Sequence, residues 1–291
     1  MEALNEALQI AFHDTRRSLK SFKGIVLLTL FVGSFLLAGV GFVLASEKAA
    51  EQLRAQLAAQ QLPVDAAAIE KEGKLKLFQT FAGDDPELAS SLSETPMIVL
   101  FFFISALAFL PALVSLMGYD TISGDVQGRT VRYTLLRARR GSYVAGKFLG
   151  QALLLAVFTL ATNLVLLGFA AIRVPDFELM AGLIGLSRYW SLALVYGLTF
   201  VALSTFCSTL TRYPLLALLL SFSALGAFGV LWMFGFGTWS LSFLSNASPF
   251  SHWGLLFSPH ADKLATGIGI YVAFIAVLLG AAYALVRAKD L

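Results

Sequence analysis

The chain has 291 residues, of which 58% are hydrophobic and 13% are charged, with a mean hydropathy of +0.78 and a formal net charge of +3. A water-soluble domain carries about twice this share of charged residues, so the composition excludes a soluble fold and indicates a polytopic membrane protein. We expect membrane lipid, and no nucleic acid, among its partners.

Residues 1–23 are polar and have a helical pattern. Apolar residues fall roughly on one helical face and basic residues gather near the end of the segment: Leu4, Leu8, Ala11, Phe12, Leu19 and Phe22 on the face, then Arg16, Arg17, Lys20 and Lys23. This pattern predicts an amphipathic interface helix in the cytoplasmic headgroup layer. A soluble tail without a partner is the alternative.

Six apolar runs are each long enough to span a hydrocarbon core, which requires about 20 residues. They are residues 24–45, 96–118, 147–172, 189–210, 215–236 and 264–286. We therefore expect an all-α membrane protein with one transmembrane domain over residues 1–291. No ionisable side chain is expected inside these spans, which argues against an ion-coupled carrier and against most intramembrane hydrolases.

The connections between the runs have their own signals. Residues 46–95 are polar with helical spacing, which predicts an external helical insert between spans one and two. Pro111 lies within span two and should kink it by freeing the carbonyl group near Leu107. Placing both termini and residues 119–146 on one side gives that side most of the Lys and Arg residues, so it is predicted to be cytoplasmic.

Two short patterns point to chemistry that we do not expect here. The sequence GSYVAGK at residues 141–147 matches most of a phosphate-binding loop, but Phe148 replaces the hydroxyl residue that would hold magnesium. Gly146 and Gly150 are better explained as a small-xxx-small pair for close helix packing. His252 and His260 share an outer loop, yet their spacing matches no metal motif, so no metal site is predicted.

The segment after span two carries most of the remaining charge, and its sequence is YDTISGDVQGRTVRYTLLRARRGSYVAGKFLG. With six spans and an amphipathic N-terminal helix, the chain resembles the permease subunit of an ABC-2 type ABC transporter, closest to the branch with copper-enzyme-maturation permeases. In that family span two is followed by a segment like (Y/R)-D-x-x-x-G-E-x-x-x-G-T-L. The residues that fit the longer pattern are Asp120, Gly124, Gly128, Leu135, Leu136, Gly146, Lys147 and Gly150.

This sequence departs from the family pattern in three places. Asp125 stands where the family usually has Glu. Arg129-Thr130-Val131 spreads the usual Gly-Thr-Leu by one residue, and the proline expected near position 138 is absent. The turn after the coupling segment is therefore expected to differ in shape from that of the family.

The resemblance implies a homodimer, or a heterodimer with a related permease, that carries two cytoplasmic ATPase subunits. ATP and magnesium would bind in those partners, so this chain would be no enzyme and would hold no cofactor. Residues 119–146 would form the cytoplasmic coupling segment, with these residues contributing: Tyr119, Asp120, Gly124, Asp125, Gly128, Arg129 and Thr130. The chain would lie in the cell inner (cytoplasmic) membrane with both termini cytoplasmic.

Physical reasoning on the same segment gives a similar picture. Its aspartates and arginines suit polar rim contacts with a soluble partner, and Val126, Val131, Tyr133 and Leu135 could supply an apolar anchor. Binding of Arg137, Arg139 and Arg140 to anionic lipid is an equally good explanation for those three residues.

The function expected from these observations is ATP-driven export of a hydrophobic or amphipathic substrate, with this chain as the membrane subunit. The alternative is a membrane scaffold that transmits mechanical work to an external accessory protein at residues 46–95, without cargo crossing the bilayer.

Overall fold

The computed structural model describes residues 2–59, 97–173, 179–236 and 242–289, and the regular elements in these ranges are all helices. Six are long and apolar enough to cross a membrane, so the predicted all-α fold with six spans is confirmed. They are α2 (Phe22–Ala59), α5 (Met97–Gly118), α8 (Arg140–Arg173), α9 (Leu179–Leu210), α10 (Pro214–Met233) and α11 (Ala261–Ala288).

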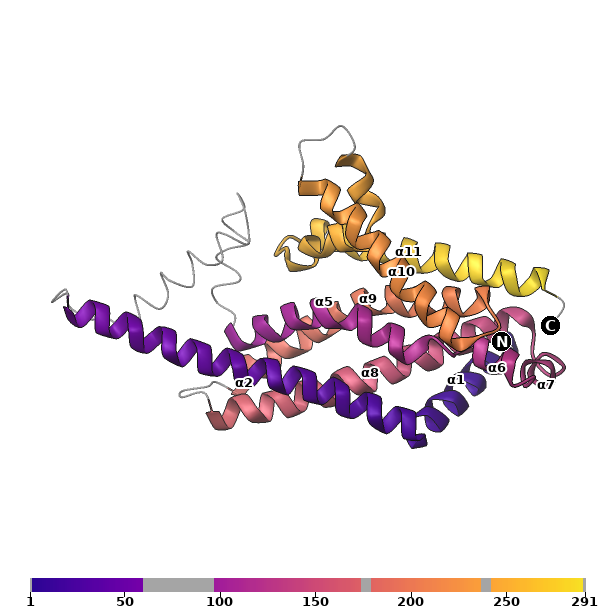
Figure 1. The fold of residues 1–291 in the computed structure, drawn as a ribbon, viewed down its shortest axis with the longest axis horizontal. Coiled ribbons are helices and arrows are strands. Elements are labelled where there is room, and N and C mark those ends of the chain that lie inside the picture. Colours follow the sequence, from indigo (N-terminus) through magenta and orange to yellow (C-terminus); the bar gives the residue numbers. More distant parts are fainter. Residues whose placement is uncertain (1, 60–96, 174–178, 237–241, 290–291) are drawn as a thin grey trace.

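The remaining elements are shorter. The chain begins with α1 (Glu2–Lys20), and two short helices, α6 (Ser123–Gln127) and α7 (Val131–Leu135), connect α5 to α8. Three 3₁₀ helices connect α10 to α11: η1 (Phe234–Phe236), η2 (Ser242–Ala247) and η3 (Pro249–Phe257). Figure 1 shows α6 and α7 at one end of the bundle, next to the start of α1 and the end of α11.

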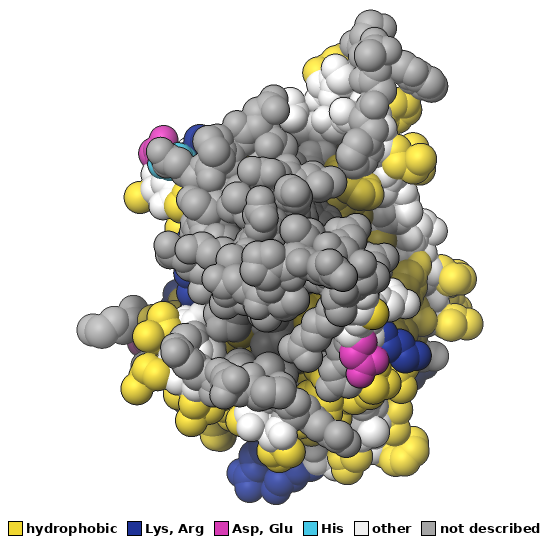
Figure 2. All heavy atoms as spheres, turned by 90° about the vertical axis from the view of Figure 1, so that its left-hand side faces the viewer, with side chains coloured by type: hydrophobic (Ala, Val, Ile, Leu, Met, Phe, Trp, Pro, Cys, Tyr) yellow, Lys and Arg dark blue, Asp and Glu magenta, His cyan; other side chains and the backbone are white. Residues whose placement is uncertain are grey.

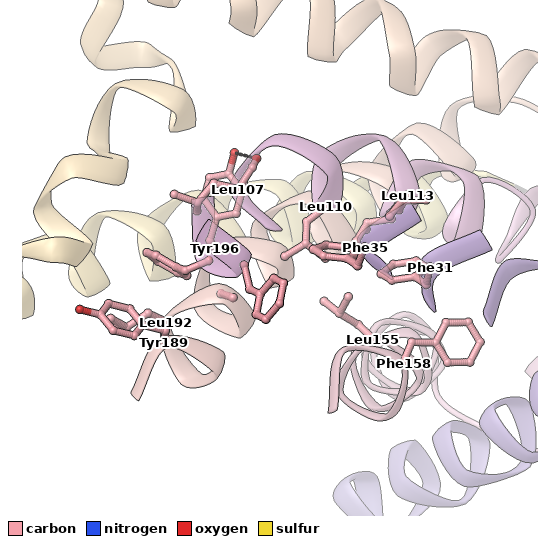
Figure 3. Close-up of a cluster of buried hydrophobic side chains, with 14 of the residues drawn as sticks. Phe31, Phe35, Leu107, Leu110, Leu113, Leu155, Phe158, Tyr189, Leu192 and Tyr196 are labelled. Atoms are coloured by element: carbon pink, nitrogen blue, oxygen red, sulfur yellow. Dashed lines mark hydrogen bonds between the residues drawn. The ribbon is translucent and has the colours of Figure 1, made fainter. Parts of the chain in front are cut away.

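The centre of the bundle is α9, which packs against α5, α8, α10 and α11. Aromatic and aliphatic side chains from α2, α5, α8 and α9 fill the core between them (Figure 3). Phe31, Leu110, Leu155, Phe158 and Phe200 have no exposed surface. Lipid tails are as apolar as these side chains, so within a bilayer the core stabilises the bundle by close van der Waals packing.

The core also supplies a hydrogen-bond donor for the carbonyl group of Leu107, which Pro111 leaves without its partner in the helix. A proline has no N–H to donate to the residue four positions earlier, which here is Leu107. The buried hydroxyl of Tyr196 on α9 donates to the Leu107 carbonyl oxygen at 3.0 Å (Figure 3). This hydrogen bond pairs a polar group that would otherwise be buried without a partner.

The outer surface of the bundle is apolar, as a bilayer requires. Exposed side chains on α10 include Leu215, Leu216, Leu219 and Leu220. Figure 2 looks at the end of the molecule opposite α6 and α7, and hydrophobic side chains appear around the flanks with charged ones at only a few places. These flanks are suited to lipid acyl chains or to another apolar helix.

Helix α1 packs closely on the first turns of α8. Ala7 and Ala11 are buried against it, while Leu4, Leu8 and Phe12 face outward and are exposed. The backbone N–H of Arg139, just before α8, donates to a carboxylate oxygen of Glu6 at 3.2 Å. That hydrogen bond holds the pKa of the Glu6 carboxyl group below its ordinary value.

The small residues of both helices explain how close this contact is. A Cβ atom on Gly146 would lie 2.8 Å from Cβ of Ile10, and one on Gly150 would lie 3.2 Å from the carbonyl oxygen of Ala11. The side chain of Thr15 donates to the Gly150 carbonyl oxygen at 3.0 Å. These glycines therefore allow a close helix approach, and the partner is α1 rather than another span.

The corner between α1 and α2 depends on a third glycine. A Cβ atom on Gly24 would lie 1.8 Å from the carbonyl oxygen of Ser18, a distance that no side chain can occupy. The N–H of Gly24 donates to the Ser21 hydroxyl at 2.9 Å, which satisfies a donor in the first turn of α2. The sharp corner brings α1 back against the first turns of α8.

Two sequence expectations need correction. The third span was expected to start at Lys147, but α8 starts two turns earlier, because the residues from Gly141 to Lys147 pack as helix against α1. Lys147 therefore lies inside a long apolar helix and is buried, contrary to the expectation that the spans contain no ionisable group. The same helical geometry rules out a phosphate-binding loop at GSYVAGK, since such a loop precedes its helix.

The predicted external insert, residues 46–95, is only partly described. Helix α2 has 38 residues and continues through Ala59, so at 1.5 Å per residue it is about 57 Å long and exceeds a hydrocarbon core of about 30 Å. The rest of the insert lies outside the described residues. On the same side, His252 Nε2 lies 2.9 Å from the Asn246 carbonyl oxygen, and the described residues contain no cluster of three or more His, Cys, Asp or Glu that could hold a metal.

Candidate functional site

The segment that the sequence singles out, from Tyr119 to Lys147, forms two short helices attached to the ends of several spans. At its start, the Ser208 hydroxyl on α9 accepts hydrogen bonds from the backbone N–H groups of Ile122 and Ser123, at 3.0 and 2.9 Å. Ser208 and Ser123 are fully buried. The start of α6 is therefore attached to the end of α9.

A small apolar cluster attaches the other side of the segment. Ile122 and Val131 are buried against Tyr143 and Val144 of α8, together with Ala282 and Val286 of α11. Val126 and Leu135 pack at the edge of this cluster. Of the four residues expected to form an apolar anchor for a partner, three therefore contact the protein itself.

The opposite face of the segment is exposed and basic. Tyr133 is 74% exposed and Leu136 is 83% exposed, and both lie among exposed arginines. Arg129, Arg132 and Arg137 make no ion pair with any residue that the structure describes. This face, Gln127–Arg137, combines two large apolar side chains with three unpaired cations.

The two aspartates of the motif do not lie on that face. Asp125 Oδ2 lies 2.7 Å from Nζ of Lys147, which is only 7% exposed, and Lys147 Nζ also lies 2.6 Å from Oδ2 of Asp14 on α1. Asp125 further accepts hydrogen bonds from the Tyr143 hydroxyl at 2.9 Å and the Thr130 hydroxyl at 3.1 Å. One buried lysine thus joins α1, α6 and α8, an arrangement that we call the Lys147 cluster (Asp14, Asp125, Tyr143, Lys147).

Asp120 is engaged in a second ion pair. Its Oδ1 lies 2.5 Å from Nζ of Lys23 at the start of α2. The same ammonium group donates to the Met117 carbonyl oxygen at 3.3 Å and lies 4.2 Å from the centre of the Tyr119 ring. This pair connects the beginning of α2 to the end of α5.

Arg129 has an unusual backbone conformation at the junction between α6 and α7. Arg129 has φ of +57°, a conformation that glycine adopts easily and arginine rarely does. Counted without a gap from Asp120 in the pattern quoted above, Arg129 stands at the second glycine, Thr130 matches the Thr that follows, and Val131 stands at the Leu position. The departure is therefore a substitution at the glycine position, and Gly128 is the residue before it.

Asp14 and Lys23 are functional candidates that sequence reasoning missed. A signal for Asp14 was present, because Ala7, Ala11 and Asp14 follow the i, i+4, i+7 spacing of one helical face. That face meets Gly146, Lys147 and Gly150, so small residues pair with small residues and the carboxylate pairs with the lysine. Nothing in the spacing alone indicated that Lys23 reaches Asp120.

The comparison with curated proteins returned no match to this chain. A family model described as ABC-2 family transporter protein matches residues 8–291. The match includes the six spans and the segment with the Lys147 cluster, and it confirms the resemblance seen in the sequence. The chain therefore belongs to the ABC-2 family of transporter proteins and is a multi-pass membrane component of that transporter type.

Proposed function

We propose that this chain is the permease subunit of an ATP-binding-cassette exporter, and that α6 and α7 dock on a separate cytoplasmic ATPase. The observation that carries the proposal is the exposed face Gln127–Arg137. It presents Tyr133 and Leu136 to the outside, while neighbouring apolar residues of the same helices pack against α8 and α11. Large apolar side chains within a polar surface are typical anchors of a protein interface.

The contacts that attach α6 and α7 to the other helices are suited to transmit motion to the spans. A displacement of α6 and α7 acts on α9 through Ser208, on α8 and α11 through Val131, and on α1 through the Lys147 cluster. Packed helices respond to such a displacement as rigid bodies rather than by gradual deformation. ATP-driven movement of the ATPases would therefore reach several spans at once.

The charges of the docking face indicate what the partner offers. Asp120 and Asp125 are paired internally, which leaves Arg129, Arg132 and Arg137 as the exposed charges around Tyr133 and Leu136. A complementary groove on the ATPase would be acidic at its rim and apolar at its centre. Arg139 and Arg140 are less suited to contact lipid or partner, since they bond to Glu2 and to the Arg287 carbonyl oxygen.

The remaining parts of the proposal follow from the family and from the bundle. Two ATPase subunits would bind ATP and magnesium, and this chain would pair with a second copy or a related permease. An uncharged core rich in Phe and Leu suits a hydrophobic or amphipathic substrate. The end of the bundle with α6 and α7, next to both termini, would face the cytoplasm from the cell inner membrane (Figure 1).

Replacement of Tyr133 by Ala tests the docking face. The variant should bind the ATPase that co-purifies with the wild-type chain at least about tenfold more weakly, since an interface anchor contributes more than about 1–2 kcal/mol. The measurement is retention of ATPase activity by the immobilised chain in mild detergent. Tyr213→Ala is the matched control, because Tyr213 is 61% exposed and lies in the short turn before α10. Equal retention by both variants would exclude α7 as the docking element.

A further inference from the structure

A cavity of about 430 Å³ lies between the α1–α2 corner, the end of α5 with α6, and α8. This volume is within the usual range for small-molecule sites, about 300–1,000 Å³. Its apolar lining comes from Leu27, Met117 and Leu154, which belong to three different spans. Lys23 and Gly24 at the start of α2 also line it, so the cavity lies at the level where helices enter the apolar layer.

The charged groups that line the cavity are separated into a negative and a positive part. Lys147 is shared by two aspartates, so the Lys147 cluster carries one net negative charge. Lys23 and Asp120 neutralise each other. Arg17, one turn after Asp14 on α1, is exposed and has no ion pair with a described residue. The charges of the lining as a whole therefore complement a zwitterionic ligand, whose positive group would face the Lys147 cluster and whose negative group would face Arg17.

The negative part has hydrogen-bond acceptors that lack donors. Gln151 lines the cavity and is 7% exposed, and its Oε1 accepts no hydrogen bond from any residue that the structure describes. Asp14 uses Oδ2 for Lys147, while its Oδ1 has only His13 at 3.9 Å, which is too far for a hydrogen bond. Leaving the buried Gln151 Oε1 without a donor costs about 1–3 kcal/mol, so a ligand with several N–H groups would be stabilised here.

We propose that this cavity binds the headgroup of an aminophospholipid such as phosphatidylethanolamine. The primary ammonium group would donate to Asp14 and Gln151, and the phosphodiester would lie at Arg17 and the Ser18 hydroxyl. The lipid source is favoured by position, because α1 carries Leu4, Leu8 and Phe12 on its outward face and the cavity adjoins the start of α2. The acyl chains would remain in the bilayer beside this corner.

The chemistry of the lining also predicts selectivity among phospholipids. A quaternary choline group has no N–H to donate and is usually held by aromatic rings, whereas no aromatic side chain is among the described residues that line the cavity. Phosphatidylglycerol has no cation for the negative part. We therefore expect phosphatidylethanolamine to bind about tenfold more tightly than either lipid, as loss of one or two charge-assisted hydrogen bonds would produce.

The test uses the purified full-length chain in detergent, without ATPase, so its result is independent of the proposed docking function. Native mass spectrometry would follow titrations with phosphatidylethanolamine, phosphatidylcholine and phosphatidylglycerol that have identical acyl chains. Arg17→Ala should weaken phosphatidylethanolamine binding about tenfold. Arg16→Ala is the matched control, because Arg16 is the neighbouring residue, is also exposed, and does not line this cavity.

Gln151→Leu provides a second variant that removes the unpaired acceptor and keeps the side-chain size. It should reduce the preference for phosphatidylethanolamine over phosphatidylcholine to less than about threefold, with binding of phosphatidylcholine unchanged. If this variant does not fold, as judged by its thermal unfolding, the comparison of Arg17→Ala with Arg16→Ala still tests the proposal. Arg17 is exposed on the helix surface and its replacement leaves the core intact.

Three results would overturn the proposal. The first is equal binding of the three lipids by the wild-type chain, and the second is an equal effect of Arg17→Ala and Arg16→Ala. The third is displacement of the lipid by free O-phosphoethanolamine at equal concentration, which would assign the cavity to a soluble amine instead. Preferential binding that depends on Arg17 and resists the free headgroup would establish the lipid site.

Discussion

Arg129 shows how a single residue can carry strain at a junction between two helices. Its φ of +57° separates α6 from α7, and the carbonyl oxygens of Asp125 and Val126 accept the N–H groups of Thr130 and Arg129 at 3.0 and 3.2 Å. An L side chain in this conformation costs about 1–2 kcal/mol relative to the right-handed helix. The arginine is exposed, and its side chain makes no hydrogen bond or ion pair with any described residue that would compensate for this cost.

Arg129→Gly should therefore raise the stability of the chain by about 1 kcal/mol. The measurement is the midpoint of thermal unfolding of the purified chain without a partner. Gln127→Gly is the matched control, since Gln127 is also exposed and lies at the end of α6, where a glycine lowers stability by about 0.5–1 kcal/mol. A lower midpoint for Arg129→Gly would show that the left-handed conformation is not the source of strain.

At the scale of elements, α1, α6 and α8 meet at a charged junction around Lys147. The sequence alone presents the same region as a polar loop followed by an apolar span. Helices α1, α6 and α8 each contribute one member of the Asp14–Lys147–Asp125 arrangement. A lysine with 7% exposure is tolerated inside an apolar helix because two carboxylates accept its N–H groups. Docking of α1 is thus coupled to the position of α6.

Lys147→Met should destabilise the chain by about 2–3 kcal/mol, because it leaves two aspartates together without a cation. This loss of stability is at the low end for a broken buried ion pair, because water still reaches the two carboxylates. The Asp14 and Asp125 side chains keep 22% and 18% of their surface exposed. The measurement is again the midpoint of thermal unfolding.

A triple variant with Asp14→Asn, Asp125→Asn and Lys147→Met serves as the control for that loss. It removes all three charges together, so it should recover most of the lost stability. If the single and the triple variants are equally unstable, packing of the lysine stem and not charge pairing holds the three helices together.

At the scale of the whole molecule, both ends of the described chain and the helices α6 and α7 lie at one end of a six-helix bundle, and α2 extends beyond the other end (Figure 1). Contacts between distant parts of the chain join the first end. Arg140 donates to the Arg287 carbonyl oxygen at 2.6 Å, and Lys289 donates to the carbonyl oxygen of Thr209 at the end of α9. Loss of water around Lys289, with Arg212 nearby, lowers the pKa of its ammonium group.

The proposed orientation, with α6 and α7 in the cytoplasm, predicts which introduced cysteines a membrane-impermeant maleimide can reach in intact cells. Lys48→Cys, on the extension of α2, should be labelled without permeabilisation, and Gln127→Cys, at the end of α6, only after it. Both positions are exposed, whereas the native Cys207 is buried and should leave the unmodified chain unlabelled. The reverse pattern would place α6 and α7 outside the cell and remove the basis for docking a cytoplasmic ATPase.

The sequence by itself determined the number of spans, the all-helical fold and the family to which the chain belongs. Each of these depends on hydropathy over about 20 consecutive residues or on a contiguous motif, which are local properties of the chain. The same holds for the carbonyl group freed by Pro111, because a proline always lacks the N–H that its residue four positions earlier requires.

Only the tertiary structure decided which polar groups meet. Tyr196 reaches the Leu107 carbonyl oxygen across two helices, and the motif aspartates turn inward to Lys23 and Lys147 instead of facing a partner. These pairings depend on where helices far apart in sequence cross, and hydropathy carries no information on that. The close approach of α1 to Gly146 and Gly150 then determined where a buried lysine, its two carboxylates and a headgroup-sized cavity could lie.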